Sequence, residues 1–266
     1  MAKQRLDALL ASRGLAPSRE TAQRYIRAGE VLVDETVFDK PGVQVDEDAV
    51  IRLTHKECDF ASRGGLKLEK ALNAFDIDVS GWTTADFGAS NGGFTDCLLR
   101  RGAVKVFAID VGHGQLAYNL QTDPRVVVMD KTNCRYVTQD DLGETVDLVT
   151  ADLSFISIEK VLPAMQSILK PGGSVIVLVK PQFEIGKGKV GKKGVVRRRE
   201  DHQQVLEDCY DAYTAAGWRI VGAAVSPITG KSGNIEFLYW MRYNQDQPSI
   251  NRSELTEIVN NAHENK

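Results

Sequence analysis

The sequence predicts an α/β protein: a mostly parallel sheet of seven strands with helices on both faces, preceded by a small α+β domain. Three observations support this fold. Near-continuous runs of Val and Ile recur between residues 83 and 242, and stretches of helical periodicity separate most of them. This pattern is typical of parallel strands that are buried on both faces. The first run also ends in a glycine-rich turn, with glycines at positions 88, 92 and 93.

Residues 1–60 are expected to form the small domain and its linker. One helix is indicated around Leu6, which shares an apolar face with Leu9 and Leu10, and Gly14 supplies its C-terminal stop. A second helix is expected after Ser18, a typical N-cap residue. Two or three short strands complete the domain. The inward-facing residues of the second helix are expected to be Ala22, Tyr25 and Ile26.

The charge is unevenly distributed along the chain. The net charge over 266 residues is -3, which argues against a uniformly basic nucleic-acid-binding protein. Residues 1–27, however, hold six Lys or Arg residues against two acidic ones, and residues 186–199 hold seven against none. Each segment could be an ordinary solvated or disordered surface. The alternative is that both bind an anionic partner.

The large domain is expected to span residues 61–245. Gly64 and Gly65 mark its start, and a helix with Lys67 near its first turn follows them. The expected strands are 83–87, 104–110, 125–130, 146–152, 174–180, 218–225 and 235–242, with helices such as 157–169 and 200–216 between them. Ligands of such sheets bind at the carboxyl ends of the strands. The polar residues at those ends are Asp86, Asp110, Asp130, Asp152 and Lys180.

The remaining features concern the C-terminal segment, the cysteines and the expected cellular location. Residues 246–266 are polar and are expected to form a peripheral or frayed tail, in which a short helix could begin at Ser253. The four cysteines are scattered without a CxxC pair, so neither a metal site nor a disulfide framework is expected. No apolar run approaches the roughly 20 residues that span a bilayer. A cytoplasmic protein without membrane partners is expected.

The glycine-rich turn predicts a nucleotide-like cofactor, because it brings backbone amides of a helix start close to a ligand. Asp110 could accept hydrogen bonds from ribose hydroxyls, as in both NAD and S-adenosylmethionine sites. The dinucleotide fingerprint requires GxGxxG, but its middle glycine is Ser90 here. A carboxylate at Asp130 could accept from an adenine amino group. Asp86 has an alternative structural role, as a cap of the next turn.

The segments DFGASNGGFTD, AIDVG, VVMDKTN and DLSF resemble S-adenosylmethionine-dependent methyltransferases with a Rossmann-like sheet. The resemblance implies S-adenosylmethionine as cofactor. It implies that the cofactor-binding residues are Asp86, Gly88, Ala89, Ser90, Gly92, Gly93, Phe94, Asp110, Val111, Asp130, Lys131 and Asp152.

The polar residues at the sheet edge indicate which atom is methylated. Asp152-Leu153-Ser154-Phe155 lacks the prolines typical of enzymes that methylate base amines, and no cysteine lies where methylation of a base carbon would need one. Lys67, Asp152, Lys180 and Glu236 instead suit a ribose 2′-hydroxyl, which must lose its proton during transfer. Lys180 is expected to act as base or to orient the hydroxyl, and Asp152 and Glu236 to orient the lysines.

The protonation state of Lys180 stays open at this level. Lys67 and partial burial favour its neutral amine, whereas Asp152 and Glu236 favour the ammonium ion. Lys67 is expected to support the site or a nearby phosphate.

Two further resemblances cover most of the chain. Arg5-Leu6-Asp7, Ser18-Arg19, Ala22, Ile26, Gly29 and Val31–Val33 resemble the RNA-binding module of ribosomal protein S-four. The order Lys, Asp, Lys and Glu resembles FtsJ-type ribose 2′-O-methyltransferases. Together with SRGGLKLEKAL, KPQFE and GNIEFLYW, these motifs are similar to the TlyA family over nearly the whole chain.

The TlyA resemblance implies a cytidine 2′-O-methyltransferase of ribosomal RNA, in a family that often carries the label haemolysin. Two alternatives stay open: a membrane-lytic protein, and an RNA-binding protein whose methyltransferase domain is inactive. The oligomeric state is not predicted. The RNA-binding residues implied or expected are Arg5, Arg19, Gln23, Arg24, Arg27, Lys187, Lys189, Lys192 and Arg197.

Overall fold

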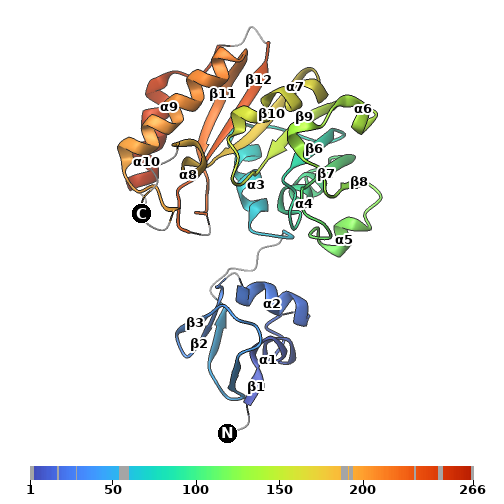
Figure 1. The fold of residues 1–266 in the computed structure, drawn as a ribbon, viewed down its shortest axis with the longest axis vertical. Coiled ribbons are helices and arrows are strands. Elements are labelled where there is room, and N and C mark those ends of the chain that lie inside the picture. Colours follow the sequence, from blue (N-terminus) through green and yellow to red (C-terminus); the bar gives the residue numbers. More distant parts are fainter. Residues whose placement is uncertain are drawn as a thin grey trace. The chain divides into compact units, whose positions relative to one another are not determined.

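The protein is described by a computed structural model and divides into two compact units, Met1–Asp59 and Phe60–Lys266 (Figure 1). Each unit has its own hydrophobic core, and the two are treated separately here. The structure describes residues 3–16, 18–27, 29–53, 60–186, 191, 194–230, 232–244 and 248–264.

The small unit packs two helices against short strands. Helix α1 (Leu6–Ser12) and helix α2 (Arg19–Arg27) contribute Leu6, Leu10 and Ile26 to its core. Strand β2 (Val31–Val33) lies between β3 (Thr36–Phe38) and β5 (Ile51–Leu53), and β1 (Lys3–Arg5) pairs with β4 (Gln44–Asp46).

The start and stop signals of these two helices lie where the sequence predicted them. The backbone N–H of Thr21 donates to Oγ of Ser18 at 3.1 Å, and Gly14 adopts a φ of +70° after α1. Both signals were local, since they depend on residues within one turn of the helix end.

The large unit is built on one seven-stranded sheet, as predicted. Its strand order is β11-β12-β10-β9-β6-β7-β8, and β12 runs in the opposite direction to the other six strands. The strands are β6 (Thr83–Phe87), β7 (Lys105–Ile109), β8 (Val126–Met129), β9 (Val146–Ala151), β10 (Leu169–Val179), β11 (Trp218–Val225) and β12 (Phe237–Tyr243).

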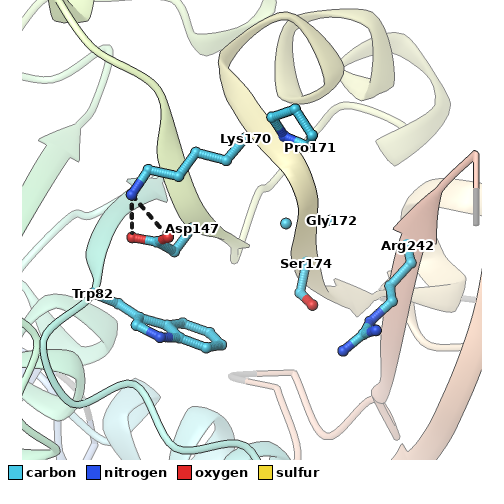
Figure 2. A pocket seen from close by; sticks show the side chains of 8 residues that line it. Trp82, Asp147, Lys170, Pro171, Gly172, Ser174 and Arg242 are labelled. Carbon is cyan, nitrogen blue, oxygen red and sulfur yellow. Dashed lines mark hydrogen bonds and ion pairs between the residues drawn. The ribbon is translucent and has the colours of Figure 1, made fainter.

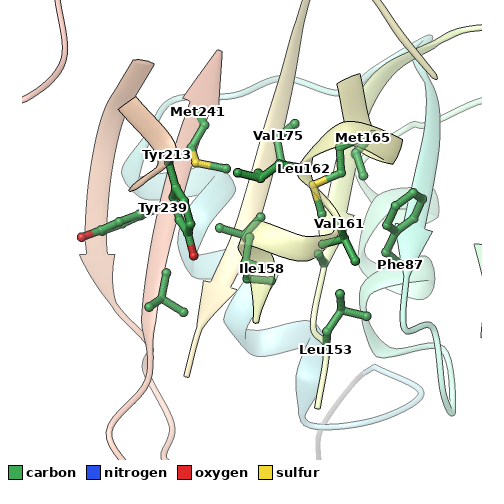
Figure 3. Packing of buried hydrophobic residues seen from close by; sticks show 14 of the residues in the cluster. Phe87, Leu153, Ile158, Val161, Leu162, Met165, Val175, Tyr213, Tyr239 and Met241 are labelled. Carbon is green, nitrogen blue, oxygen red and sulfur yellow. The ribbon is translucent and has the colours of Figure 1, made fainter. Parts of the chain in front are cut away.

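Helices cover both faces of the sheet, because successive strand residues point to opposite faces and both sets are apolar. Val175 and Val177 of β10 join a core with Met165 and Leu206, part of which Figure 3 shows. Ile176, between them, joins the opposite core. The helices are α3 (Gly64–Ala74), α4 (Gly93–Arg100), α5 (Tyr118–Gln121), α6 (Gln139–Leu142), α7 (Leu162–Ile168), α8 (Pro181–Glu184), α9 (Arg199–Ala215) and α10 (Arg252–Glu264), with 3-10 turns at Cys134–Tyr136 and Ile158–Lys160.

The C-terminal segment differs from the frayed tail that its polarity predicted. Helix α10 packs against α9 and β11, and Leu255 and Val259 are fully buried in the core. Ile258 and Ala262 pack against the same core at helical spacing. Four apolar residues on one face are therefore enough to hold a helix whose other faces are polar. Among the helices that the structure describes, none is long and apolar enough to cross a membrane.

A cavity of about 190 Å³ opens at the amino-terminal edge of the sheet, beside the starts of β9 and β10 (Figure 2). Its lining includes Trp82, Arg242 and the ion pair between Lys170 and Asp147. The predicted site residues lie at the opposite, carboxyl-terminal edge. This cavity is therefore separate from the candidate active site.

Candidate active site

Four charged side chains, predicted from strand ends and a helix start, meet at the carboxyl-terminal edge of the sheet. Nζ of Lys180 lies 2.6 Å from Oδ1 of Asp152, and Nζ of Lys67 lies 2.7 Å from Oε2 of Glu236. Lys67 also lies 3.5 Å from Oδ2 of Asp152, which links the two pairs. We call this set the KDKE cluster.

The strand directions explain how the KDKE cluster assembles. Asp152 and Lys180 directly follow the parallel strands β9 and β10, so they emerge at the same edge. Glu236 directly precedes β12, which runs antiparallel, and its start therefore lies at that edge too. Lys67 reaches the cluster from the first turns of α3.

The cluster is neutral overall and largely removed from water. Lys67 and Lys180 are each 7% exposed and Glu236 is 3% exposed. Burial favours the neutral form of Asp152, but the attraction of Lys180 and Lys67 outweighs it, so the pKa of this carboxyl lies below its usual value. Asp152 is therefore an ionised partner for both lysines near neutral pH.

Three neighbours of the cluster were not predicted as site residues. Oγ of Ser154 accepts from Nζ of Lys180 at 3.1 Å, and the side-chain amide of Gln182 donates to Glu236 at 3.4 Å. Phe155 is 91% exposed and has a φ of +65°. Its ring lies 5.0 Å from that of Phe183. A backbone φ in the left-handed region is unusual for a non-glycine residue, and such backbone outliers concentrate at functional sites.

The glycine-rich turn between β6 and α4 lies beside the KDKE cluster. Gly88 and Gly92 have φ values of +84° and +92°, which only glycine adopts readily. A Cβ atom at Gly88 would also lie 2.8 Å from the backbone oxygen of Asp152. Ala89, Gly92, Gly93 and Phe94 are buried, whereas Ser90 is exposed.

The predicted acidic residues at the ends of β7 and β8 both hold backbone amides. Asp110 accepts from the amides of Ser90 and Gly112 at 2.8 and 2.7 Å. Asp130 accepts from the amide of Gly114 at 2.8 Å and lies 2.9 Å from Nδ1 of His113. The loop after β7 therefore bridges both carboxylates. Val111 and Lys131 are exposed beside them.

Asp86 differs from the other carboxylates predicted to bind the cofactor because it is fully buried. Burial raises the pKa of its carboxyl to about 7, although hydrogen bonds from Thr95 and Thr150 oppose the shift. These hydroxyls donate at 2.7 and 3.2 Å. Its observed partners belong to the fold, and a role toward a cofactor stays a prediction.

The predicted RNA-binding residues of the small unit lie on β1 and α2. Arg5, Arg19, Arg24 and Arg27 are exposed, and Gln23 is half-buried. Arg197 of the large unit is exposed as well. Three further predicted residues, Lys187, Lys189 and Lys192, lie outside the described residues.

The described cysteines do not take part in the candidate site. Cys97, Cys134 and Cys209 are buried, and burial raises the pKa of each thiol. A nucleophilic thiolate is therefore not favoured at any of them. Within the described residues, no three His, Cys, Asp or Glu side chains form a group that could hold a metal ion.

The sheet order, the glycine-rich turn and the KDKE cluster define a methyltransferase of the FtsJ type. The FtsJ-like methyltransferase family model matches residues 60–243, and the S4 domain model matches residues 4–51. The chain belongs to the FtsJ-like methyltransferase family and, among its members with an S4 domain, to the TlyA family.

Relatives and solved structures support this assignment. The chain is 45% identical to the 16S/23S rRNA (cytidine-2′-O)-methyltransferase TlyA of Mycobacterium tuberculosis, over 97% of this chain and 96% of that protein. It is 37% identical to Hemolysin A of Brachyspira hyodysenteriae, over 88% of this chain and 98% of the relative. A structure from Streptococcus thermophilus, provisionally described as a hemolysin, superposes with a TM-score of 0.79 at 40% identity and covers 99% of this chain and 97% of its own.

Proposed function

We propose that the chain transfers a methyl group from S-adenosylmethionine to the ribose 2′-hydroxyl of a cytidine in ribosomal RNA. The observation that carries this proposal is the position of Lys180, which Asp152 holds at 2.6 Å beside the glycine-rich turn. The printed activity of the TlyA relative supports the nucleotide and the RNA class. A ribosomal substrate also agrees with the expected cytoplasmic location.

The residues at the sheet edge fit S-adenosylmethionine. Gly88 and Gly92 have positive φ values and no side chains, and carboxylates at Asp110 and Asp130 lie at the ends of adjacent strands. These groups suit an amino-acid moiety and an adenosine, respectively. The bound cofactor would supply an electrophilic methyl group on a sulfonium sulfur.

Lys180 is the residue that we place against the substrate hydroxyl. Nζ of Lys180 contacts Asp152 and Ser154, and a third direction at this nitrogen can face the ribose oxygen, with an N–H in the ammonium ion or a lone pair in the neutral amine. As the new C–O bond forms, the hydroxyl proton must leave. A neutral Lys180 would accept that proton, whereas an ammonium ion would only orient the oxygen. In either case Lys67 helps to hold Asp152 in place, and Glu236 holds Lys67.

Phe155 provides a surface for the target base. RNA bases that are unpaired stack on exposed aromatic side chains, and this ring lies three residues after Asp152. We infer that the base of the target nucleotide stacks here while its ribose faces Lys180.

The test is to map 2′-O-methylation on ribosomal RNA after incubation with the purified chain and S-adenosylmethionine. Reverse transcription at low nucleotide concentration should stop at a new cytidine with the wild-type chain. A Lys180→Ala variant that still binds the cofactor should produce no stop. If no site appears with the wild-type chain on intact subunits or on free RNA, the proposal fails, and the inactive-domain alternative is favoured.

Membrane lysis is the second candidate, because one relative is named Hemolysin A. Dye release from protein-free vesicles made of zwitterionic and anionic lipids tests it directly. Release at the same rate by wild-type and Lys180→Ala chains would establish a lytic activity independent of methyl transfer. Intact vesicles would leave methyl transfer as the function.

A further inference from the structure

A single buried carboxylate joins most of the predicted RNA-binding residues of the small unit. Asp7 is fully buried in the first turn of α1. Arg5 donates to it from Nε and Nη2, at 3.1 and 2.9 Å. The side-chain amide of Gln23 donates to it at 2.8 Å, and Nε of Arg19 lies 3.2 Å away.

The contacts extend to a fourth residue. Nη2 of Arg27 donates to Oε1 of Gln23 at 3.3 Å, and Gln23 in turn holds Asp7. Four of the five RNA-binding residues predicted on β1 and α2 therefore belong to one network centred on a carboxylate that no solvent reaches. We call this set the Asp7 network.

The network leaves guanidinium nitrogens available at the surface. Arg19 approaches Asp7 through Nε, and its side chain is 54% exposed, so solvent and an RNA phosphate can reach its guanidinium group. Arg5 is 44% exposed. Two terminal nitrogens in one plane match a phosphate group, which such a fork binds bidentately.

We propose that Asp7 is a positioning residue for RNA: it holds Arg5, Arg19 and, through Gln23, Arg27 in the orientation that receives the phosphate backbone. The inference rests on the proposed RNA substrate. Three guanidinium groups in one patch repel one another, and a buried carboxylate among them offsets that repulsion. RNA then meets side chains that are already ordered, which lowers the entropic cost of binding.

A positioning role of Asp7 and a simple charge argument predict opposite effects on RNA affinity when the negative charge of Asp7 is removed. Asp7→Asn raises the positive charge of the patch by one, so a simple charge argument predicts tighter binding to RNA and a steeper salt dependence. Positioning predicts weaker binding in spite of the added positive charge. The sign of the change therefore separates the two explanations.

The experiment measures the Kd of the full-length chain for a ribosomal RNA fragment, together with kcat and KM for methyl transfer. With Asp7→Asn we expect about a tenfold rise in Kd and KM and an unchanged kcat, because the reaction takes place in the other unit. Glu35→Gln is the matched control. It removes a carboxylate of the same unit that pairs with Arg52 outside the Asp7 network. Its Kd should stay equal or fall.

A loss of folding would be distinguished in two ways. Far-UV circular dichroism and a thermal melt show whether Asp7→Asn retains the small unit. The double variant Asp7→Asn, Arg19→Ala then measures the coupling between the two residues in RNA binding. If Asp7 acts through Arg19, the rise in Kd of the double variant is smaller than the product of the rises in the two single variants. If Asp7→Asn is folded and binds as tightly as the wild type or more tightly, the positioning role is refuted. If the wild-type chain itself does not bind ribosomal RNA, the proposed function fails instead.

Discussion

Lys67 and Glu236 are 169 positions apart in the sequence, yet their charged groups lie 2.7 Å apart with both side chains buried. This pair supports the other half of the KDKE cluster, since Nζ of Lys67 also lies 3.5 Å from Oδ2 of Asp152. A buried charge pair holds its geometry only while both partners are present.

Glu236→Gln should therefore lower the stability of the large unit. The change leaves Lys67 buried with one carboxylate at a longer distance, and we expect the free energy of unfolding to fall by about 3 kcal/mol. Urea unfolding measures it. Glu144→Gln is the control, because it breaks an ion pair of the same length whose side chains are about 40% exposed. It should cost less than about 1 kcal/mol, and an equal loss in both variants would contradict the prediction.

Lys180→Arg distinguishes a base from a hydroxyl-orienting group. Arginine retains the charge and the hydrogen-bond donors but does not give up a proton near neutral pH. If Lys180 is the base, kcat should fall by a factor of about 100 or more, as it should in Lys180→Ala. Substantial activity in Lys180→Arg together with none in Lys180→Ala would instead show orientation. Single-turnover methyl transfer from labelled cofactor measures both.

Phe155→Ala should separate activity from stability. The ring is 91% exposed, so its removal should change the free energy of unfolding by less than about 1 kcal/mol. Loss of base stacking, worth about 1–3 kcal/mol, should lower kcat/KM on RNA by about tenfold or more. Cofactor affinity, measured by calorimetry, should not change. Unaltered kcat/KM would rule out the proposed stacking role.

Asp86 should make the large unit less stable at high pH. Its pKa is about 7 in the folded chain and about 3.9 when unfolded. The folded state therefore binds the proton more tightly, and this stability is fully present below pH 4 and is lost as the pH rises through 7. At about 1.4 kcal/mol per pKa unit, the loss amounts to about 4 kcal/mol.

Asp86→Asn removes that ionisation. Urea unfolding at pH 5, 6, 7 and 8 should show a smaller decline with pH for the variant than for the wild type. The variant should also be the more stable of the two at pH 8. Parallel declines for both chains would show that Asp86 does not titrate in this way.

The sequence was sufficient for the sheet and for the part of the KDKE cluster that lies at strand ends, because both follow from strand order. Runs of Val and Ile identify the strands, and the ends of parallel strands meet at one edge, which brings Asp152 and Lys180 together. Glu236 lies at the same edge because β12 is antiparallel, so the start of this strand meets the ends of β9 and β10.

Other features depended on contacts that no local pattern encodes. In the sequence, Asp7 is one acidic residue that lowers the positive charge of the first helices. In the structure it is the common partner of Arg5, Arg19 and Gln23. Phe155 belongs to a motif, but neither its exposure of 91% nor its backbone φ of +65° can be read from that motif. The packing of α10 depends on four apolar residues, and the many polar residues around them in the sequence led to the prediction of a frayed tail.

The place of β12 in the sheet has a consequence for how the chain is made. This strand inserts between β10 and β11 and directly follows Glu236, so the KDKE cluster is incomplete until residues beyond 236 have left the ribosome. The small unit, in contrast, contains all of its own strands within the first 59 residues. A growing chain thus completes the strands of the small unit before the KDKE cluster can assemble.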